Sequence, residues 1–136
     1  WASSGRRRSC STCTATTRLL DWEMATVGDP LMDLGSALAY WVEPSDDEGL
    51  LTAGFSPTAY PGFFTREEFV AAYQEHTGRP VRHWEYYYAY GLFKLAVILQ
   101  QIYVRWLQGL TTDQRFATLN RSVQALARQG ALIARG

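Results

Sequence analysis

The sequence of 136 residues has few of the side chains that most often bind transition metals or act as nucleophiles, with two histidines and two cysteines. Cys10 and Cys13 form a single Cys-x-x-Cys pair, whereas a zinc site of this kind needs a second pair of ligands. His76 and His83 have no further ligand at metal-binding spacing. The sequence therefore predicts no zinc site and no catalytic thiol, and the two cysteines are interpreted as free thiols.

The chain has no net charge, because thirteen basic residues balance thirteen acidic ones. A neutral total argues against general binding of nucleic acid. The charge is uneven, since four arginines and no acid precede Leu19, while the rest has nine basic and thirteen acidic residues. The basic segment is too short to change the expectation that nucleic acid is not a partner.

No apolar run is long enough to cross a membrane. The most apolar run, residues 95–104, contains two glutamines and is bounded by Lys94 and Arg105. This is well short of the ~20 apolar residues that a spanning helix needs. Residues 1–17 contain arginines but no apolar segment behind them, so they do not form a signal peptide. We therefore expect a cytoplasmic protein with no membrane partner.

Residues 1–17 also lack acids and, after Trp1, almost all large apolar side chains. The contrast with the sequence from Arg18 onward is abrupt. One hypothesis is that the natural chain is longer and is read in a different frame here, and the other is a disordered tail. A hydrophobic content of 47% excludes disorder of the whole chain, so residues 18–136 are predicted to form one domain.

A short apolar run, residues 18–20, ends at the carboxylate of Asp21 and is followed by Trp22. This pattern predicts a buried strand that delivers an acid to the rim of a sheet. Ligands often bind beyond the ends of such strands. Asp21 is therefore the first candidate site residue.

A helix is predicted after this strand. Asp29 is a suitable N-cap, and Pro30 suits the first helical position. The apolar residues that follow give the helix one apolar face, at Leu31, Leu34, Leu38 and Trp41. Asp33 lies in the first turn, where the helix dipole favours an anion. Asp21, Asp29 and Asp33 are thus expected to gather around one strand–turn–helix corner.

Residues 42–64 are predicted to form a long connection, of the kind that often acts as a lid or a binding loop. Its acidic run, Asp46, Asp47 and Glu48, is expected to face water. A contact with a cationic substrate is the alternative for these three acids.

The remainder of the chain is predicted to be helical. Thr65 and Glu68 have the spacing of a capping box. Residues 83–108 contain no proline and are apolar nearly all round, which is typical of a helix at the centre of a bundle. Four tyrosines crowd its first turns, so some should pack and others should offer hydroxyls at the rim. Thr111 or Thr112 is the expected cap of a last amphipathic helix.

Lys94 is a cation within the long apolar helix. Its neighbours one turn away, Tyr90 and Ile98, cannot pair with it, so the ammonium needs an acid from elsewhere or a route to water. Asp33 and Glu23 are the candidate partners. In the alternative interpretation, the stem packs and the ammonium reaches solvent.

The segment around Asp21 resembles the sequence after the catalytic loop in the aminoglycoside phosphotransferase and choline kinase-like family. The likeness rests on residues 20–23, 28–30 and 33–35. It is closest to the branch of kinase-like domains associated with acyl-CoA dehydrogenases. Less specific similarity continues through the helices, so that the resemblance covers residues 18 to about 126.

This resemblance implies a mainly α fold, the helical C-lobe of a protein-kinase-like fold with a short strand or hairpin remnant at its N-terminal end. It implies that Asp21 holds Mg²⁺ against the phosphates of ATP. It further implies that Asp33 braces the catalytic loop, and for Asp29 the family role coincides with the N-cap.

The family's His-Gly-Asp-x-x-x-x-Asn catalytic loop has no counterpart, because residues 1–17 contain no His, Asp or Asn. The resemblance thus implies the C-terminal part of an ATP-dependent phosphotransferase that phosphorylates a small-molecule hydroxyl, inactive by itself. The alternative is a non-catalytic helical binding or interaction module. In either case, a helix face left by the missing lobe would favour self-association.

Overall fold

The computed structural model describes residues 27–135, which form five α-helices and two 3₁₀ helices without a strand. In chain order these are α1 Leu31–Tyr40, α2 Glu48–Ala53, η2 Pro57–Ala59, α3 Arg66–Thr77, α4 Trp84–Leu107, η3 Gln114–Thr118 and α5 Leu119–Ile133. The prediction of a mainly α fold is confirmed. The strand predicted at residues 18–20 and the boundary after residue 17 lie outside the described residues.

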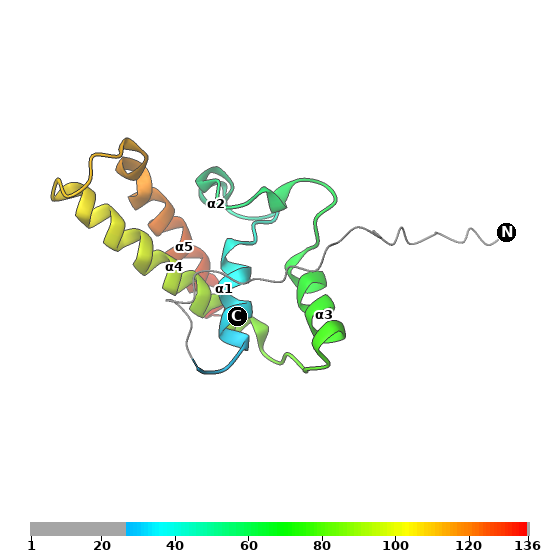
Figure 1. The fold of residues 1–136 in the computed structure, drawn as a ribbon. Coiled ribbons are helices and arrows are strands. Elements are labelled where there is room, and N and C mark those ends of the chain that lie inside the picture. Colours follow the sequence, from blue (N-terminus) through cyan, green and yellow to red (C-terminus); the bar gives the residue numbers. More distant parts are fainter. Residues whose placement is uncertain (1–26, 136) are drawn as a thin grey trace, which may run out of the picture.

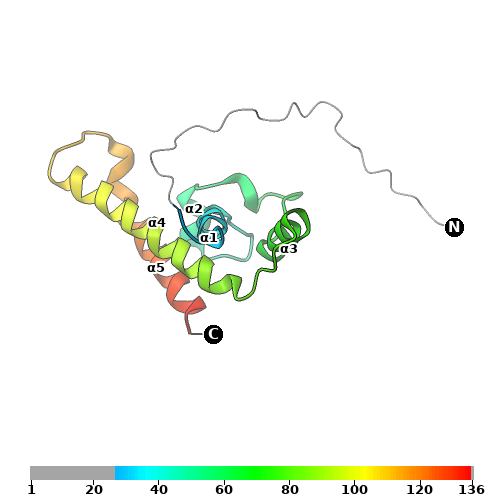
Figure 2. The same ribbon diagram turned by 60° about the horizontal axis from the view of Figure 1, so that its bottom comes forward.

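α4 is the central helix of this arrangement. It forms an antiparallel hairpin with α5 and packs against α1 on another side (Figure 1). α3 lies beyond α1, away from the hairpin, in both ribbon views (Figure 2). No helix within residues 27–135 is long and apolar enough to cross a membrane.

α1 and α4 cross in close contact at two glycines. A methyl group on Gly91 would lie 2.1 Å from the backbone oxygen of Gly35. A methyl group on Gly35 would lie 2.2 Å from the backbone oxygen of Tyr87. Glycine inside a helix costs about 1 kcal/mol relative to alanine. Here that cost is offset because the two backbones approach closely enough to bury the side chains on both sides of the crossing.

The hydrophobic core lies where α1, α4 and α5 meet. Its largest fully buried side chains are those of Leu38, Tyr88, Leu92 and Leu126. Leu34 is also buried and Leu31 is half-buried, so the predicted apolar face of α1 is confirmed. Trp41, just past the end of α1, stacks on Phe69 of α3 with the ring centroids 4.5 Å apart. The same face therefore joins α1 both to the core and to α3.

α3 begins with the predicted capping box. The Thr65 hydroxyl accepts the backbone N–H of Glu68 at 3.1 Å, and the Glu68 carboxylate accepts that of Thr65 at 2.8 Å. The helix ends at Gly78, whose φ of 66° is left-handed. Both ends follow the local signals in the sequence.

The segment of residues 42–64 is more ordered than predicted. It contains α2 and η2, whose first turns are capped by the side chains of Asp47 and Ser56. The buried Thr58 hydroxyl donates to the backbone oxygen of Val42 at 2.9 Å and accepts its N–H at 2.8 Å. The long connection predicted for residues 42–64 therefore contains two short helices, and local caps and this buried bridge hold it down.

The expectation that the acidic run faces water is wrong for Asp46 and confirmed for its two neighbours. The Asp46 side chain is only 4% exposed and pairs with the guanidinium of Arg66, which also pairs with Glu43 at 3.3 Å. Arg66 donates to the backbone oxygen of Trp41 at 2.6 Å and lies 4.6 Å from the ring centroid of Tyr88. Two carboxylates thus compensate the buried cation, and the network joins this segment to α3 and α4.

The last helix does not begin at the predicted cap. Asp113 accepts the backbone N–H of Arg115 at 2.9 Å and caps η3, and α5 starts only after η3. The expected cap of the last helix at Thr111 or Thr112 is therefore wrong, because η3 precedes α5 and the N-cap of α5 is Thr118.

We expect Gly91→Ala to lower the free energy of unfolding by about 3 kcal/mol, because the added methyl overlaps the backbone of α1 and cannot be accommodated by a rotamer change. Gly130→Ala in α5 is the matched control. Its methyl would meet the nearest atom at 3.8 Å, so it should be neutral or stabilise by up to about 1 kcal/mol. Urea unfolding followed by circular dichroism measures both, and equal effects would refute the tight crossing.

Alkaline unfolding should depend on Tyr88. Burial raises the pKa of Tyr88 from 10.0 to about 12, against the opposing effect of Arg66. The unfolded chain loses this proton near pH 10, so the stability due to the neutral hydroxyl is complete below pH 10 and is lost as the pH rises toward 12. Urea unfolding over this interval should show a shallower decline for Tyr88→Phe than for the parent chain. Parallel declines would contradict this assignment.

Candidate functional site

A groove of about 790 Å³ lies where the start of α1 meets the first half of α4. Its lining residues are Gly28, Asp29, Pro30, Met32, Asp33, Tyr86, Tyr87, Tyr90 and Lys94. Three of the four predicted site residues, Asp29, Asp33 and Lys94, therefore share one groove. The fourth, Asp21, lies outside the described residues.

Asp29 holds the start of α1 in place. One carboxylate oxygen accepts the backbone N–H of Leu31 at 3.0 Å, and the other accepts the hydroxyl of Tyr87 at 2.7 Å. These two hydrogen bonds, the backbone one first, lower the pKa of Asp29, and the contact with Asp29 raises the pKa of Tyr87. α1 begins at Leu31 with Pro30 as its N-cap, one residue later than predicted, and Asp29 accepts the first helical N–H from just before the cap. Asp29 also joins α1 to α4.

Pro30 has a helical backbone, with φ −62° and ψ −17°, as expected for the entry to α1. Asp33 follows in the first turn and is exposed. Among residues 27–135 its carboxylate accepts no hydrogen bond and joins no ion pair. In the described part of the groove, the Asp29 carboxylate is therefore engaged in hydrogen bonds, and the Asp33 carboxylate is available to a ligand.

Lys94 is exposed at the far end of the groove. It does not pair with Asp33, and the second candidate partner, Glu23, lies outside the described residues. Lys94 also borders a narrower slot of about 180 Å³ between α1 and α4, which is lined by Ser36, Tyr40, Gly91, Leu95 and Ile98. Among the described residues, the Lys94 ammonium reaches solvent and pairs with no carboxylate, as the alternative interpretation expected.

The tyrosines at the start of α4 divide as predicted. Tyr88 is 1% exposed and packs in the core, whereas Tyr86 is 66% exposed at the groove. The specific partner of Tyr87 was not predicted. It lies 58 residues away in the sequence, and no local pattern indicates a contact over that separation.

The arrangement offers hydrogen-bond donors, one free carboxylate and one cation to a polar ligand. It does not by itself make a metal site, because no group of three or more potential His, Cys, Asp or Glu ligands occurs in the part of the chain that is described. A Mg²⁺ ion can be held by one or two carboxylates when phosphates and water complete its shell. The free Asp33 carboxylate beside a cation is compatible with such a shell but does not complete it.

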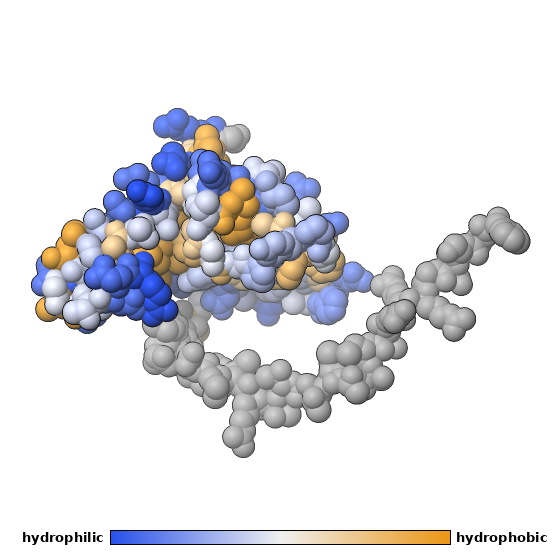
Figure 3. Space-filling view, turned by 90° about the horizontal axis from the view of Figure 1, so that it is seen from above, coloured by the Kyte–Doolittle hydropathy of each residue, from blue (hydrophilic) through white to orange (hydrophobic). Residues whose placement is uncertain are grey.

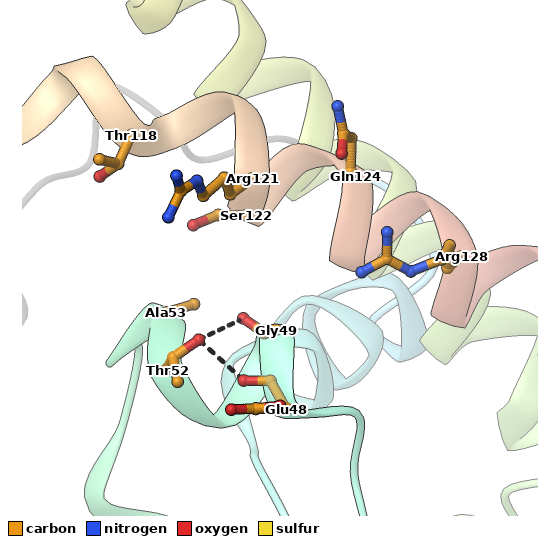
Figure 4. A pocket seen from close by; sticks show the side chains of 9 residues that line it. All are labelled: Glu48, Gly49, Thr52, Ala53, Thr118, Arg121, Ser122, Gln124 and Arg128. Atoms are coloured by element: carbon orange, nitrogen blue, oxygen red, sulfur yellow. Dashed lines mark hydrogen bonds between the residues drawn. The ribbon is translucent and has the colours of Figure 1, made fainter.

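A second hollow, of about 560 Å³, lies between α2 and α5 (Figure 4). Arg121 and Ser122 of α5 point toward α2, where the Thr52 hydroxyl donates to the backbone oxygen of Glu48 at 2.8 Å. Arg128 pairs with Asp47 at 3.5 Å. The charged lining residues are one glutamate, Glu48, and two arginines, and no lining residue belongs to the motif of residues 20–35. The groove between α1 and α4 is therefore the stronger candidate.

Comparison with known proteins finds relatives along most of the chain. The probable acyl-CoA dehydrogenase IBR3 of Arabidopsis thaliana is 34% identical over 111 residues, which are 79% of this chain and 13% of that protein. Acyl-CoA dehydrogenase family member 10 of Mus musculus is 36% identical over 80% of this chain and 11% of its own length. Family member 11 of Rattus norvegicus is 32% identical, over 86% and 15% respectively. The chain thus spans less than one sixth of these relatives, and no solved structure matches it.

A sequence profile of the phosphotransferase enzyme family matches residues 14–90. This range is more than half of the chain and contains α1, α2, α3 and the first turns of α4. It includes the Asp21 motif, both aspartates of the groove and the tyrosines opposite them. The chain belongs to the phosphotransferase enzyme family.

Proposed function

We propose that the chain is the C-terminal part of an ATP-dependent phosphotransferase that acts on a hydroxyl group of a small molecule. The observation that supports this most strongly is the groove at the start of α1. There, residues of the family motif meet tyrosine hydroxyls and a lysine from α4. Family membership supplies the reaction class, and the groove supplies a place for polar ligands.

Phosphoryl transfer depends mainly on positioning and on electrostatic stabilisation of the transferred group. Mg²⁺ and ATP, when bound, supply the phosphoryl group and neutralise its charge. Asp21 is the residue proposed to ligate the metal, and Asp33 is proposed to brace the catalytic loop. Asp29 fixes the start of α1, on which Asp33 lies, by its bond to Tyr87. Lys94 and the exposed tyrosine hydroxyls are suited to hold polar groups of the ligand.

The base of the reaction has to come from sequence outside these 136 residues, since the chain contains no His-Gly-Asp loop. We therefore propose that the chain is inactive alone. That same lack favours the second candidate, a non-catalytic helical binding module. The expectation of a cytoplasmic protein that binds neither nucleic acid nor membrane stays a prediction.

Calorimetric titration of the 136-residue chain with Mg²⁺ and ATP tests the role of Asp21. We expect millimolar binding or tighter, weakened about tenfold or more by Asp21→Ala because a metal ligand is lost. Glu75→Ala removes an exposed carboxylate of α3 that does not line the groove, and should bind like the parent. Absence of binding by the parent chain at millimolar nucleotide would instead support the non-catalytic module.

Lys94→Met separates a ligand contact from a structural ion pair. Because Lys94 is exposed and unpaired among the described residues, we expect the free energy of unfolding to stay within about 0.5 kcal/mol of the parent. The same variant should weaken nucleotide binding in the calorimeter. A loss of about 3–5 kcal/mol in urea unfolding would show instead that Lys94 belongs to a buried pair.

A further inference from the structure

A third hollow, of about 240 Å³, lies where the starts of α3 and α4 meet the end of α5. None of its lining residues borders the groove between α1 and α4. Figure 3 shows hydrophobic surface at the free end of the hairpin of α4 and α5, which is the opposite end of both helices. The hollow is therefore separate from the candidate site and from that surface. Its walls include Arg66, Glu67, Trp84, Tyr88, Gln129 and Ile133.

Two polar atoms at this hollow are buried without a partner. The Nε atom of Arg66 and the hydroxyl of Tyr88 form no hydrogen bond within residues 27–135, although Arg66 is 6% exposed and Tyr88 is 1% exposed. The other two guanidinium nitrogens of Arg66 already pair with Glu43 and Asp46. Buried polar groups are nearly always hydrogen-bonded, because an unpaired one loses its contacts with water and gains nothing. Both atoms thus need a partner that the described residues do not supply.

The Gln129 amide borders the hollow and does not satisfy the Tyr88 hydroxyl. Burial raises the pKa of Tyr88, Arg66 lowers it, and the Gln129 amide lowers it further, so the amide lies near the hydroxyl. The hydroxyl nevertheless forms no hydrogen bond with it. A small polar group between the two side chains could bridge them.

The chemistry of the two unpaired atoms restricts what this group can be. The Nε–H of an arginine can only donate, so a partner has to present an acceptor. The charge of Arg66 is already balanced by Glu43 and Asp46, and Glu67 adds a further carboxylate at the exposed rim. This excess of negative charge opposes an anion. The acceptor that fits is therefore an uncharged oxygen.

We propose that this hollow binds an uncharged ligand whose oxygen accepts hydrogen bonds from the Nε–H of Arg66 and the hydroxyl of Tyr88. The hydroxyl or carboxamide group of a small molecule has this chemistry, and so does water. Such a group also donates, and the Glu67 carboxylate and the Gln129 amide oxygen are acceptors at the same hollow. This inference is independent of the proposed reaction.

The size and walls of the hollow suit a small molecule. Its volume of about 240 Å³ is larger than the ~30 Å³ that one water takes in the liquid. The rings of Trp84 and Tyr88 stack with their centroids 6.2 Å apart and, with Ile133, provide apolar surface. Thr65 and Glu67 at the rim are exposed, so a ligand can enter from solvent. A small alcohol or amide combines a polar head with an apolar body in the same way.

Titration of the 136-residue chain with acetamide, followed by the NMR signal of the Arg66 Nε–H, provides the first test. Acetate is the matched probe, because it has nearly the same shape and carries a negative charge. We expect a saturable shift with acetamide at millimolar concentration, and binding of acetate at least about tenfold weaker because carboxylates surround the hollow. Acetate that binds as tightly as acetamide would overturn the proposal.

Tyr88→Phe tests the contact with the tyrosine hydroxyl. It removes one hydrogen bond to the ligand and should weaken acetamide binding about three- to tenfold. Tyr103→Phe is the matched control, since it removes a hydroxyl from the same helix but outside the hollow, and it should bind like the parent. Equal weakening in both variants, or unchanged binding by Tyr88→Phe, would contradict the assignment.

Nuclear Overhauser contacts to the Arg66 Nε–H distinguish the two sources of the oxygen. In buffer alone this proton should contact a long-lived water. Loss of that contact on addition of acetamide, with new contacts to the probe, identifies a small-molecule site, whereas a water contact that persists identifies water as the ligand. The proposal fails if neither contact appears.

Urea unfolding of Tyr88→Phe provides a test that needs no added ligand. If the hydroxyl is bonded to a resident ligand, its removal should lower the urea midpoint. Removal of a buried hydroxyl that has no partner should instead raise the midpoint, because the cost of keeping it from water disappears. A raised midpoint would therefore overturn the proposal.

Discussion

The close crossing of α1 and α4 is the constraint on which the rest of the described fold depends. Gly35 and Gly91 bring the two backbones together, and a side chain on either glycine would overlap the opposite helix. Because the helices lie so close, Leu38 on one and Leu92 on the other are fully buried in the core. The same approach places the start of α1 within hydrogen-bonding reach of Tyr87. Packing at two glycines thus determines where Asp29 and Asp33 lie.

The candidate site is a consequence of this packing together with the Arg66 network. The crossing forms the groove between Asp33 and the residues of α4. Asp29 holds the start of α1, which lines the groove, by its hydrogen bond to Tyr87. Arg66 joins the segment of residues 42–64 to α3 and α4 through two carboxylates and the Tyr88 ring. The groove therefore lies on helices held by buried contacts, which is the condition for placing functional groups with precision.

Local signals in the sequence predicted α1, α3, α4 and α5, the cap of α3 and the grouping of Asp29 and Asp33, because caps and apolar periodicity depend on residues that lie close together in the sequence. The contacts that were missed join distant residues. Asp46 and Arg66 are 20 residues apart in the sequence, and Tyr87 and Asp29 are 58 residues apart. Contacts between residues so far apart produce no periodic pattern in the sequence. Asp46 was misassigned for this reason, since an acid in a polar run is exposed unless the fold brings it a cation. The role of Asp21 stays a prediction.

Native-state hydrogen exchange measures most directly whether the α1–α4 crossing organises the fold. The account predicts that amides of residues 35–39 in α1 and 91–96 in α4 are among the slowest to exchange. It also predicts that they open with the same free energy as global unfolding, because neither helix can leave without exposing the shared core. If the α1 amides exchanged through a much cheaper opening while α4 stayed protected, α1 would be a peripheral element, and the crossing could not be what positions the site.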